Sequence, residues 1–116
     1  MEGIGYYING VFTPHDEEEL LNEWNNMLSE SDIDAELNKV IFIDADTAYY
    51  LRATGVEYTS TQLVNVDEIS KLIGLLGITC TTKTCSNSST GCVPKKDRLG
   101  CTDCWSGDCT KSITAN

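Results

Sequence analysis

The first 79 residues contain no cysteine, and all six cysteines of the 116-residue chain lie between Cys80 and Cys109. Disulfide chemistry or thiolate–metal chemistry is therefore confined to the C-terminal third. Histidine is scarce as well, since His15 is the single one and lies far from the cysteines in the sequence. The sequence pairs no serine or cysteine nucleophile with His15, so a catalytic site built on it is not expected.

Basic residues are few, with eight lysines and arginines against 18 acidic residues and a net charge of −10. Fifteen acidic and three basic residues give residues 1–78 a charge of −12, whereas three acidic and five basic residues give residues 79–116 a charge of +2. A strongly acidic surface repels the phosphates of nucleic acids. Nucleic acid is therefore not an expected partner.

Long apolar runs are also lacking. The longest ones, such as Val40-Ile41-Phe42-Ile43, have the length of a strand, whereas a membrane-spanning helix needs about 18 apolar residues. We therefore expect no membrane insertion. The first residues, Met1 to Ile4, show neither the basic flank nor the apolar stretch of a secretory signal peptide.

The N-terminal residues predict a hairpin followed by a helix. Asn9-Gly10 stands between β-prone residues of the segment 4–12, and Asn-Gly favours the tight turn of a two-residue hairpin. Thr13 is expected to cap the helix, with Pro14 at its first position and acidic residues near its positive end. The apolar face of this helix is formed by Leu20, Leu21, Trp24, Met27 and Leu28.

Five further elements are expected before residue 79. They are a short helical turn over residues 31–37, strands at 40–44, 49–53 and 56–64, and a short amphipathic helix over 67–77 that ends at Gly77. The predicted fold class is α+β, with a small N-terminal module of residues 1–78. This acidic module contains a hairpin, an amphipathic helix, two to three further strands and a short helix.

Residues 79–116 form a second segment of different composition. Thirteen of these 38 residues are serine or threonine, and apart from cysteine the larger apolar residues are Val93, Leu99, Trp105 and Ile113. Hydrophobic burial alone cannot offset the entropy lost in ordering such a segment. Cross-links, a metal or docking on the first module must supply the rest, so we expect a loop-rich segment that disulfides hold together.

The cysteine spacing leaves three interpretations open. An even number of cysteines in a short, polar segment favours disulfides, and six cysteines allow 15 pairings that the sequence cannot distinguish. The candidates are Cys80, Cys85, Cys92, Cys101, Cys104 and Cys109. Three bridges of about 2 to 4 kcal/mol each would hold the segment where apolar residues cannot.

Structural zinc is the first alternative. Cys101-Thr102-Asp103-Cys104 has the spacing of one half of a four-thiolate site, and Cys80 with Cys85 could provide a looser second half. The second alternative is a precursor peptide, in which dehydrated serines and threonines capture cysteine sulfurs. Its composition resembles that of a lanthipeptide precursor, but no double-glycine cleavage site precedes Cys80.

Aromatic residues supply candidates for protein contact. Tyrosines on predicted strands alternate between the core and the surface, and an exposed tyrosine gives an apolar ring with a polar end that suits a protein interface. The candidate interaction residues are Tyr6, Tyr7, Tyr49, Tyr50 and Trp105.

Two carboxylates, Asp44 and Asp46, end an apolar strand in a layout that resembles the start of a haloacid-dehalogenase-type site. Ala48 breaks that pattern, and we interpret the two residues as turn residues. The chain is thus expected to be no enzyme and to need no cofactor, unless zinc is bound. We expect a structural or protein-interaction module of an extracellular or virion assembly, with a protein partner or self-assembly. If the cysteines bind zinc, an intracellular adaptor in the cytoplasm is expected.

Overall fold

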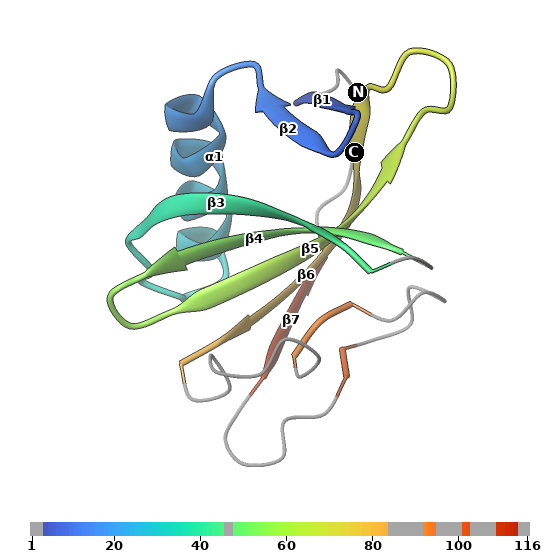
Figure 1. Cartoon of the computed structure of the whole chain (residues 1–116). Coiled ribbons are helices and arrows are strands. Elements are labelled where there is room, and N and C mark those ends of the chain that lie inside the picture. Colours follow the sequence, from blue (N-terminus) through green and yellow to red (C-terminus); the bar gives the residue numbers. More distant parts are fainter. Residues whose placement is uncertain (1–3, 46–47, 84–91, 95–100, 103–108, 114–116) are drawn as a thin grey trace.

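The computed structural model describes residues 4–45, 48–83, 92–94, 101–102 and 109–113. Its elements in chain order are β1 (Gly5–Ile8), β2 (Val11–Pro14), α1 (Glu17–Glu30), β3 (Leu37–Asp44), β4 (Tyr49–Gly55), β5 (Thr59–Val66), β6 (Ile73–Thr82) and β7 (Thr110–Ile113). Strands β1 and β2 form one sheet, and β3 to β7 form an antiparallel five-stranded sheet in sequence order (Figure 1).

The predicted α+β class with several helices is wrong. The structure is mostly β, with two sheets and α1 as the one helix, of 14 residues, in the described part of the chain. The reason is that each strand from β3 to β6 lies next to its sequence neighbour, so short local connections complete a sheet. Two segments that we predicted to be helical have other structures, and both lead into strands of this sheet.

The first of these segments is residues 31–37. Ser31 is the C-cap of α1, and Asp32 follows with a positive φ of 62°. The amide of Ile33 donates to the carbonyl of Leu28 over 2.9 Å, and the amide of Asp32 donates to that of Ser29 over 3.1 Å. These bonds form a Schellman motif, which satisfies carbonyls at the helix end and stops the helix.

The second segment is residues 67–77. Asp67 accepts hydrogen bonds from the amides of Ile69 and Ser70, and Lys71 has a positive φ of 64°, which ends any helical course. Residues from Ile73 onward then pair with β5 as strand β6. The apolar spacing that favoured a helix therefore belongs to a buried strand.

The N-terminal hairpin is confirmed. Asn9 and Gly10 have φ of 51° and 80°, as a type I′ turn requires, and Ile8 pairs with Val11 across the turn. The helix α1 is confirmed too, but the Asp16 carboxylate caps it by accepting from the amide of Glu19, whereas Thr13 was expected to do so. Pro14 ends strand β2 instead of starting the helix.

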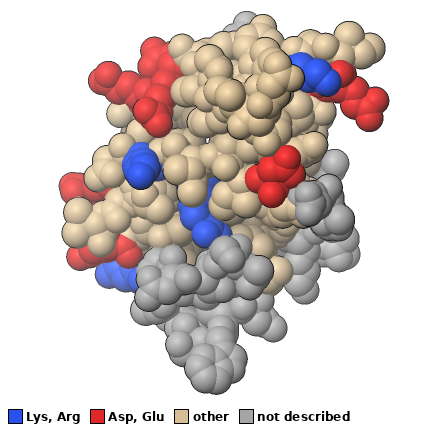
Figure 2. Space-filling model, viewed as in Figure 1, with Lys and Arg blue, Asp and Glu red and all other residues tan. Residues whose placement is uncertain are grey.

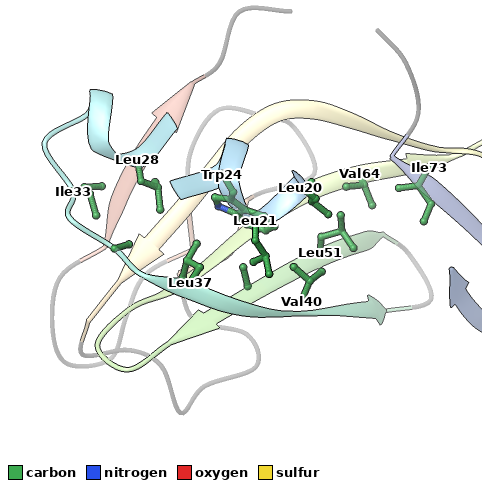
Figure 3. Close-up of a cluster of buried hydrophobic side chains, with 12 residues drawn as sticks. Leu20, Leu21, Trp24, Leu28, Ile33, Leu37, Val40, Leu51, Val64 and Ile73 are labelled. Carbon is green, nitrogen blue, oxygen red and sulfur yellow. The ribbon is translucent and has the colours of Figure 1, made fainter. Parts of the chain in front are cut away.

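The main core lies between the five-stranded sheet and a layer made of α1 and the hairpin (Figures 1 and 3). Leu20, Leu21, Trp24 and Leu28 of the helix pack there against buried residues of β3, β4, β5 and β6. On the hairpin, the ring of Tyr7 stacks on that of Phe42 of β3, with 4.0 Å between ring centroids. The predicted apolar face of the helix thus forms the core, with Met27 partly buried at its margin.

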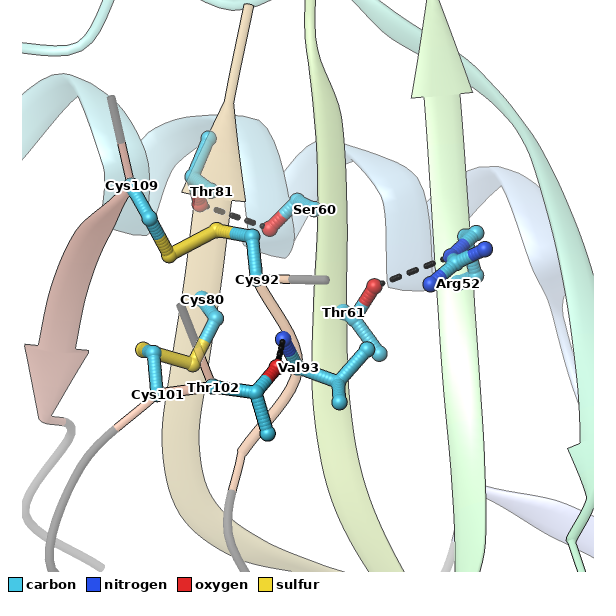
Figure 4. The surroundings of a disulfide bond; sticks show 10 residues. All are labelled: Arg52, Ser60, Thr61, Cys80, Thr81, Cys92, Val93, Cys101, Thr102 and Cys109. Carbon is cyan, nitrogen blue, oxygen red and sulfur yellow. Dashed lines mark hydrogen bonds between the residues drawn. A yellow bond between two sulfur atoms is a disulfide. The ribbon is translucent and has the colours of Figure 1, made fainter. Parts of the chain in front are cut away.

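The opposite face of the sheet is covered as well. Every residue of β5 from Thr59 to Val64 is buried, although a strand that covers one core would bury alternate residues only. Cys92, Val93 and Pro94 are buried too, and Cys92 and Val93 lie on this second face (Figure 4). The sheet therefore lies between the helix with the hairpin on one face and the residues around Cys92 on the other.

The predicted boundary between residues 78 and 79 falls inside β6. This strand pairs with β5 on one side and with β7 on the other, so the sheet continues into the cysteine segment. The division of the chain into two parts at this point remains a prediction.

Candidate functional site

A disulfide joins Cys80, which lies in the sheet, to Cys101, which lies against the second face of the sheet (Figure 4). Cys80 lies in β6 opposite Thr61 of β5, and its side chain is fully buried. The bridge anchors Cys101 because its other cysteine, Cys80, belongs to a strand that is held by backbone pairing on both sides.

A second disulfide joins Cys92 to Cys109, the residue that directly precedes β7. The sulfurs of Cys80, Cys101 and Cys109 all lie within 4.8 Å of one another, so the two bridges are neighbours. Disulfides are thus shown for four of the six candidate cysteines. Cys85 and Cys104 lie outside the described residues.

Backbone hydrogen bonds support the same arrangement. The amide of Cys92 donates to the carbonyl of Thr102 over 3.1 Å, and the amide of Thr102 donates to that of Val93 over 2.8 Å. The Thr102 hydroxyl accepts a further bond from the Val93 amide. Cys92 and Cys101 therefore belong to two short segments that are hydrogen-bonded to each other.

The predicted zinc set was Cys80, Cys85, Cys101 and Cys104, of which the structure describes Cys80 and Cys101. Cys80 and Cys101 are bonded to each other, so neither has a thiolate to offer a metal while the bridge is closed. The disulfides are compatible with an extracellular location, because such bonds persist in oxidising surroundings.

The second face also carries a buried cation that the sequence did not single out. The Arg52 side chain is 9% exposed, and its Nε donates to the Thr61 hydroxyl over 3.0 Å. Burial lowers the pKa of the guanidinium below its ordinary value. Arg52 pairs with Thr61 across the strands, and Thr61 pairs with Cys80, so the cation and the disulfide share one face.

The candidate interaction tyrosines lie in three different environments. Tyr7 of the hairpin and Tyr49 of the sheet belong to a ring cluster with Phe42, between the hairpin and the sheet. Tyr50 is partly buried, which raises the pKa of its hydroxyl. Tyr6 is exposed on β1, and its ring meets that of His15 edge to face at 5.2 Å between centroids. Trp105 lies outside the described residues.

The hairpin presents an apolar outer surface, which we call the hairpin patch and define as Tyr6, Ile8 and Val11. These side chains are 36%, 46% and 60% exposed. Ile8 pairs with Val11 across the turn, and Tyr6 is two residues from Ile8 on the same face. The alternation with the inward rings Tyr7 and Phe12 was a signal in the sequence that could have indicated this surface.

Acidic groups lie on two sides of the hairpin patch. Figure 2 shows an uncharged area over the hairpin, with acidic side chains on its left and, together with a basic side chain, on its right. The helix α1 contributes Glu17, Glu18 and Glu19 in its first turn.

Of the two aspartates interpreted above as turn residues, Asp44 ends strand β3. Asp44 accepts a hydrogen bond from the Tyr7 hydroxyl over 3.1 Å, and Asp46 lies outside the described residues. Partial burial, this bond and the charge of Asp44 together raise the pKa of Tyr7. Asp44 thus helps to hold the hairpin against the sheet.

No helix of the described residues is long and apolar enough to cross a membrane. Comparison with protein-family models, with curated proteins and with solved structures finds no significant match.

Proposed function

We propose that the chain is a non-enzymatic structural or protein-interaction module of an extracellular or virion assembly, and that it contacts protein through the hairpin patch. The observation that carries this proposal is the exposure of Tyr6, Ile8 and Val11 together on one face of a fixed hairpin. Adjacent exposed apolar side chains indicate protein contact, whereas single ones are common on any surface.

The hairpin is held in place, which suits a docking surface. Its backbone bonds to the chain around the start of β6, because the amide of Ile4 donates to the Ile73 carbonyl and that of Tyr7 donates to the Lys71 carbonyl. The ring stack of Tyr7 on Phe42 fixes its inner face. A surface that is ordered before binding loses less entropy when a partner docks.

The disulfide-fastened second face supports the extracellular or virion setting. Two bridges hold residues that contribute little apolar area of their own, and such cross-links stabilise small folds against unfolding and proteolysis. A virion is built inside a cell and meets oxidising surroundings after release. The disulfides of a virion protein can therefore close after release.

The charge of the chain predicts how assembly depends on salt. Contact between two copies brings their acidic groups together, so added salt should strengthen self-assembly by screening the repulsion. Binding to a basic partner should instead weaken with salt. The sign of the salt dependence therefore distinguishes self-assembly from binding to a basic partner.

The test is sedimentation velocity on the oxidised chain over a range of protein and salt concentrations. The double variant Ile8→Ser with Val11→Ser should move self-association to at least about tenfold higher concentration, because it removes apolar area from the contact. The matched control is Ile69→Ser with Val56→Ser, which makes the same chemical changes at side chains that are 93% and 92% exposed on two separate turns.

The control should associate as the wild type does. Equal association of both double variants and the wild type would show that the hairpin patch is not the contact surface. A wild type that stays monomeric at every concentration would exclude self-assembly. The same pair of double variants would then be compared for binding to any purified partner of the assembly.

A further inference from the structure

The four described cysteines are held together by more than their own bridges. Cys80 lies in β6 and Cys109 directly precedes β7, and these two strands pair with each other. Cys92 and Cys101 lie in the two short segments joined by the backbone bonds of Thr102. Backbone pairing alone would thus keep two pairs of cysteines close if both disulfides were opened.

The distances between the sulfurs suit a single metal ion. In a tetrahedral zinc site with Zn–S bonds of about 2.3 Å, neighbouring sulfurs lie about 3.8 Å apart. The sulfurs of Cys80, Cys101 and Cys109 already lie within 4.8 Å of one another, and that of Cys92 is 2.00 Å from that of Cys109. Small side-chain rotations could therefore place four sulfurs around one ion.

The surroundings of the sulfurs also favour a thiolate site. Cys80 and Cys92 are 0% and 2% exposed, while Cys101 and Cys109 are partly buried, so water would be largely excluded. Four thiolates around Zn²⁺ carry a net charge of −2. The buried guanidinium of Arg52 has the opposite charge and lies on the same face of the sheet, two strands away from Cys80.

We propose that the reduced chain binds one Zn²⁺ through Cys80, Cys92, Cys101 and Cys109, so that the metal replaces the two disulfides. A dithiol reductant opens each bridge with two electrons and two protons and becomes a cyclic disulfide itself, which leaves four thiols. Zinc then binds these four sulfurs and releases four protons. The same fold could thus exist with zinc in a reducing compartment and with disulfides outside it.

This set differs from the one that the C-x2-C spacing predicts. That set takes Cys85 and Cys104 in place of Cys92 and Cys109, so paired variants separate the two possibilities. The reduced protein has no disulfides to lose, so each double serine variant changes only the number of thiols, by two. The proposal does not depend on the hairpin patch.

The experiment is titration of the reduced full chain with Zn²⁺, and with Co²⁺ as a spectroscopic probe, without oxygen. The wild type should bind one ion per chain and show the visible absorption of tetrahedral cobalt with thiolate ligands. Cys85→Ser with Cys104→Ser should keep both properties. Cys92→Ser with Cys109→Ser should lose stoichiometric binding.

A second measurement is independent of the variants. Alkylation of the zinc-loaded wild type, followed by peptide mass mapping, should find Cys85 and Cys104 modified quickly and the other four cysteines protected. Absence of stoichiometric binding by the wild type would overturn the proposal. Loss of binding in the Cys85 and Cys104 double variant, or quick alkylation of Cys92 and Cys109 with zinc bound, would overturn it too.

Discussion

The indole Nε1 of Trp24 donates a hydrogen bond to the Ser60 hydroxyl over 2.8 Å, and this bond joins the helix α1 to the central strand β5. The Ser60 hydroxyl lies 2.9 Å from that of Thr81 in β6, so the polar contact continues across the strands. All three residues are buried. The serine in the middle of the core is therefore explained by the tryptophan, because its hydroxyl accepts the hydrogen bond that the buried indole N–H needs.

Ser60→Ala should lower the free energy of unfolding by about 1 to 3 kcal/mol, because the buried Trp24 Nε1 loses its acceptor. Urea denaturation of the oxidised protein, followed by far-ultraviolet circular dichroism, measures this change. Ser29→Ala makes the same substitution at an exposed position of α1 and should change stability by a few tenths of a kcal/mol at most. Equal denaturation midpoints for the two variants would contradict the role of the Trp24–Ser60 bond.

Thr79→Val should stabilise the protein by about 1 kcal/mol, because the Thr79 hydroxyl is the one buried side-chain group in the described residues without a hydrogen-bond partner. Valine keeps the shape and the preference for strands. Thr81→Val is the matched control in the same strand, and it should destabilise because the Thr81 hydroxyl is bonded to Ser60. Denaturation midpoints that move in the same direction for both variants would contradict this assignment.

Replacing Cys80 and Cys101 together by alanine should lower the free energy of unfolding by about 3 kcal/mol, since the bridge closes a loop with a sequence separation of 21. The corresponding change for Cys92 and Cys109, with a separation of 17, should be similar. Denaturation of each oxidised double variant tests both values. A variant as stable as the wild type would show that its bridge is not formed or contributes nothing.

The turn before β6 predicts a dependence of stability on pH. The amides of Ser70 and Ile69, the Ser70 hydroxyl and the charge of Lys71 hold the pKa of Asp67 below its ordinary value of 3.8. The carboxylate therefore contributes stability that is present above pH 3.8 and is lost as the pH falls through the lower pKa of the folded state.

Asp67→Asn should remove this contribution at neutral pH, so that the variant loses less stability than the wild type on acidification. Urea denaturation at a series of pH values measures the two curves. Asp34→Asn, at an exposed residue outside that turn, should leave the slope of the wild-type curve nearly unchanged. Parallel curves for Asp67→Asn and the wild type would contradict the prediction.

Short-range patterns predicted the hairpin and the helix because their causes are local. Asn9 and Gly10 tolerate positive φ, and Leu20, Trp24 and Leu28 recur at helical spacing, so neighbouring residues suffice to form the elements. The cap was placed wrongly at Thr13, because Thr13 and Pro14 are engaged in pairing with β1 and Asp16 is the next residue able to cap.

The sequence alone thus determined where cysteine chemistry can occur and which local turns and helical faces form. Only the tertiary structure decided that residues 73–82 form a strand, that Cys80 joins Cys101 while Cys92 joins Cys109, and that Tyr6, Ile8 and Val11 stay exposed together. The physical reason is distance along the chain. Strand pairing and disulfides join residues that no local pattern connects, so their free energy is gained only when the whole sheet forms.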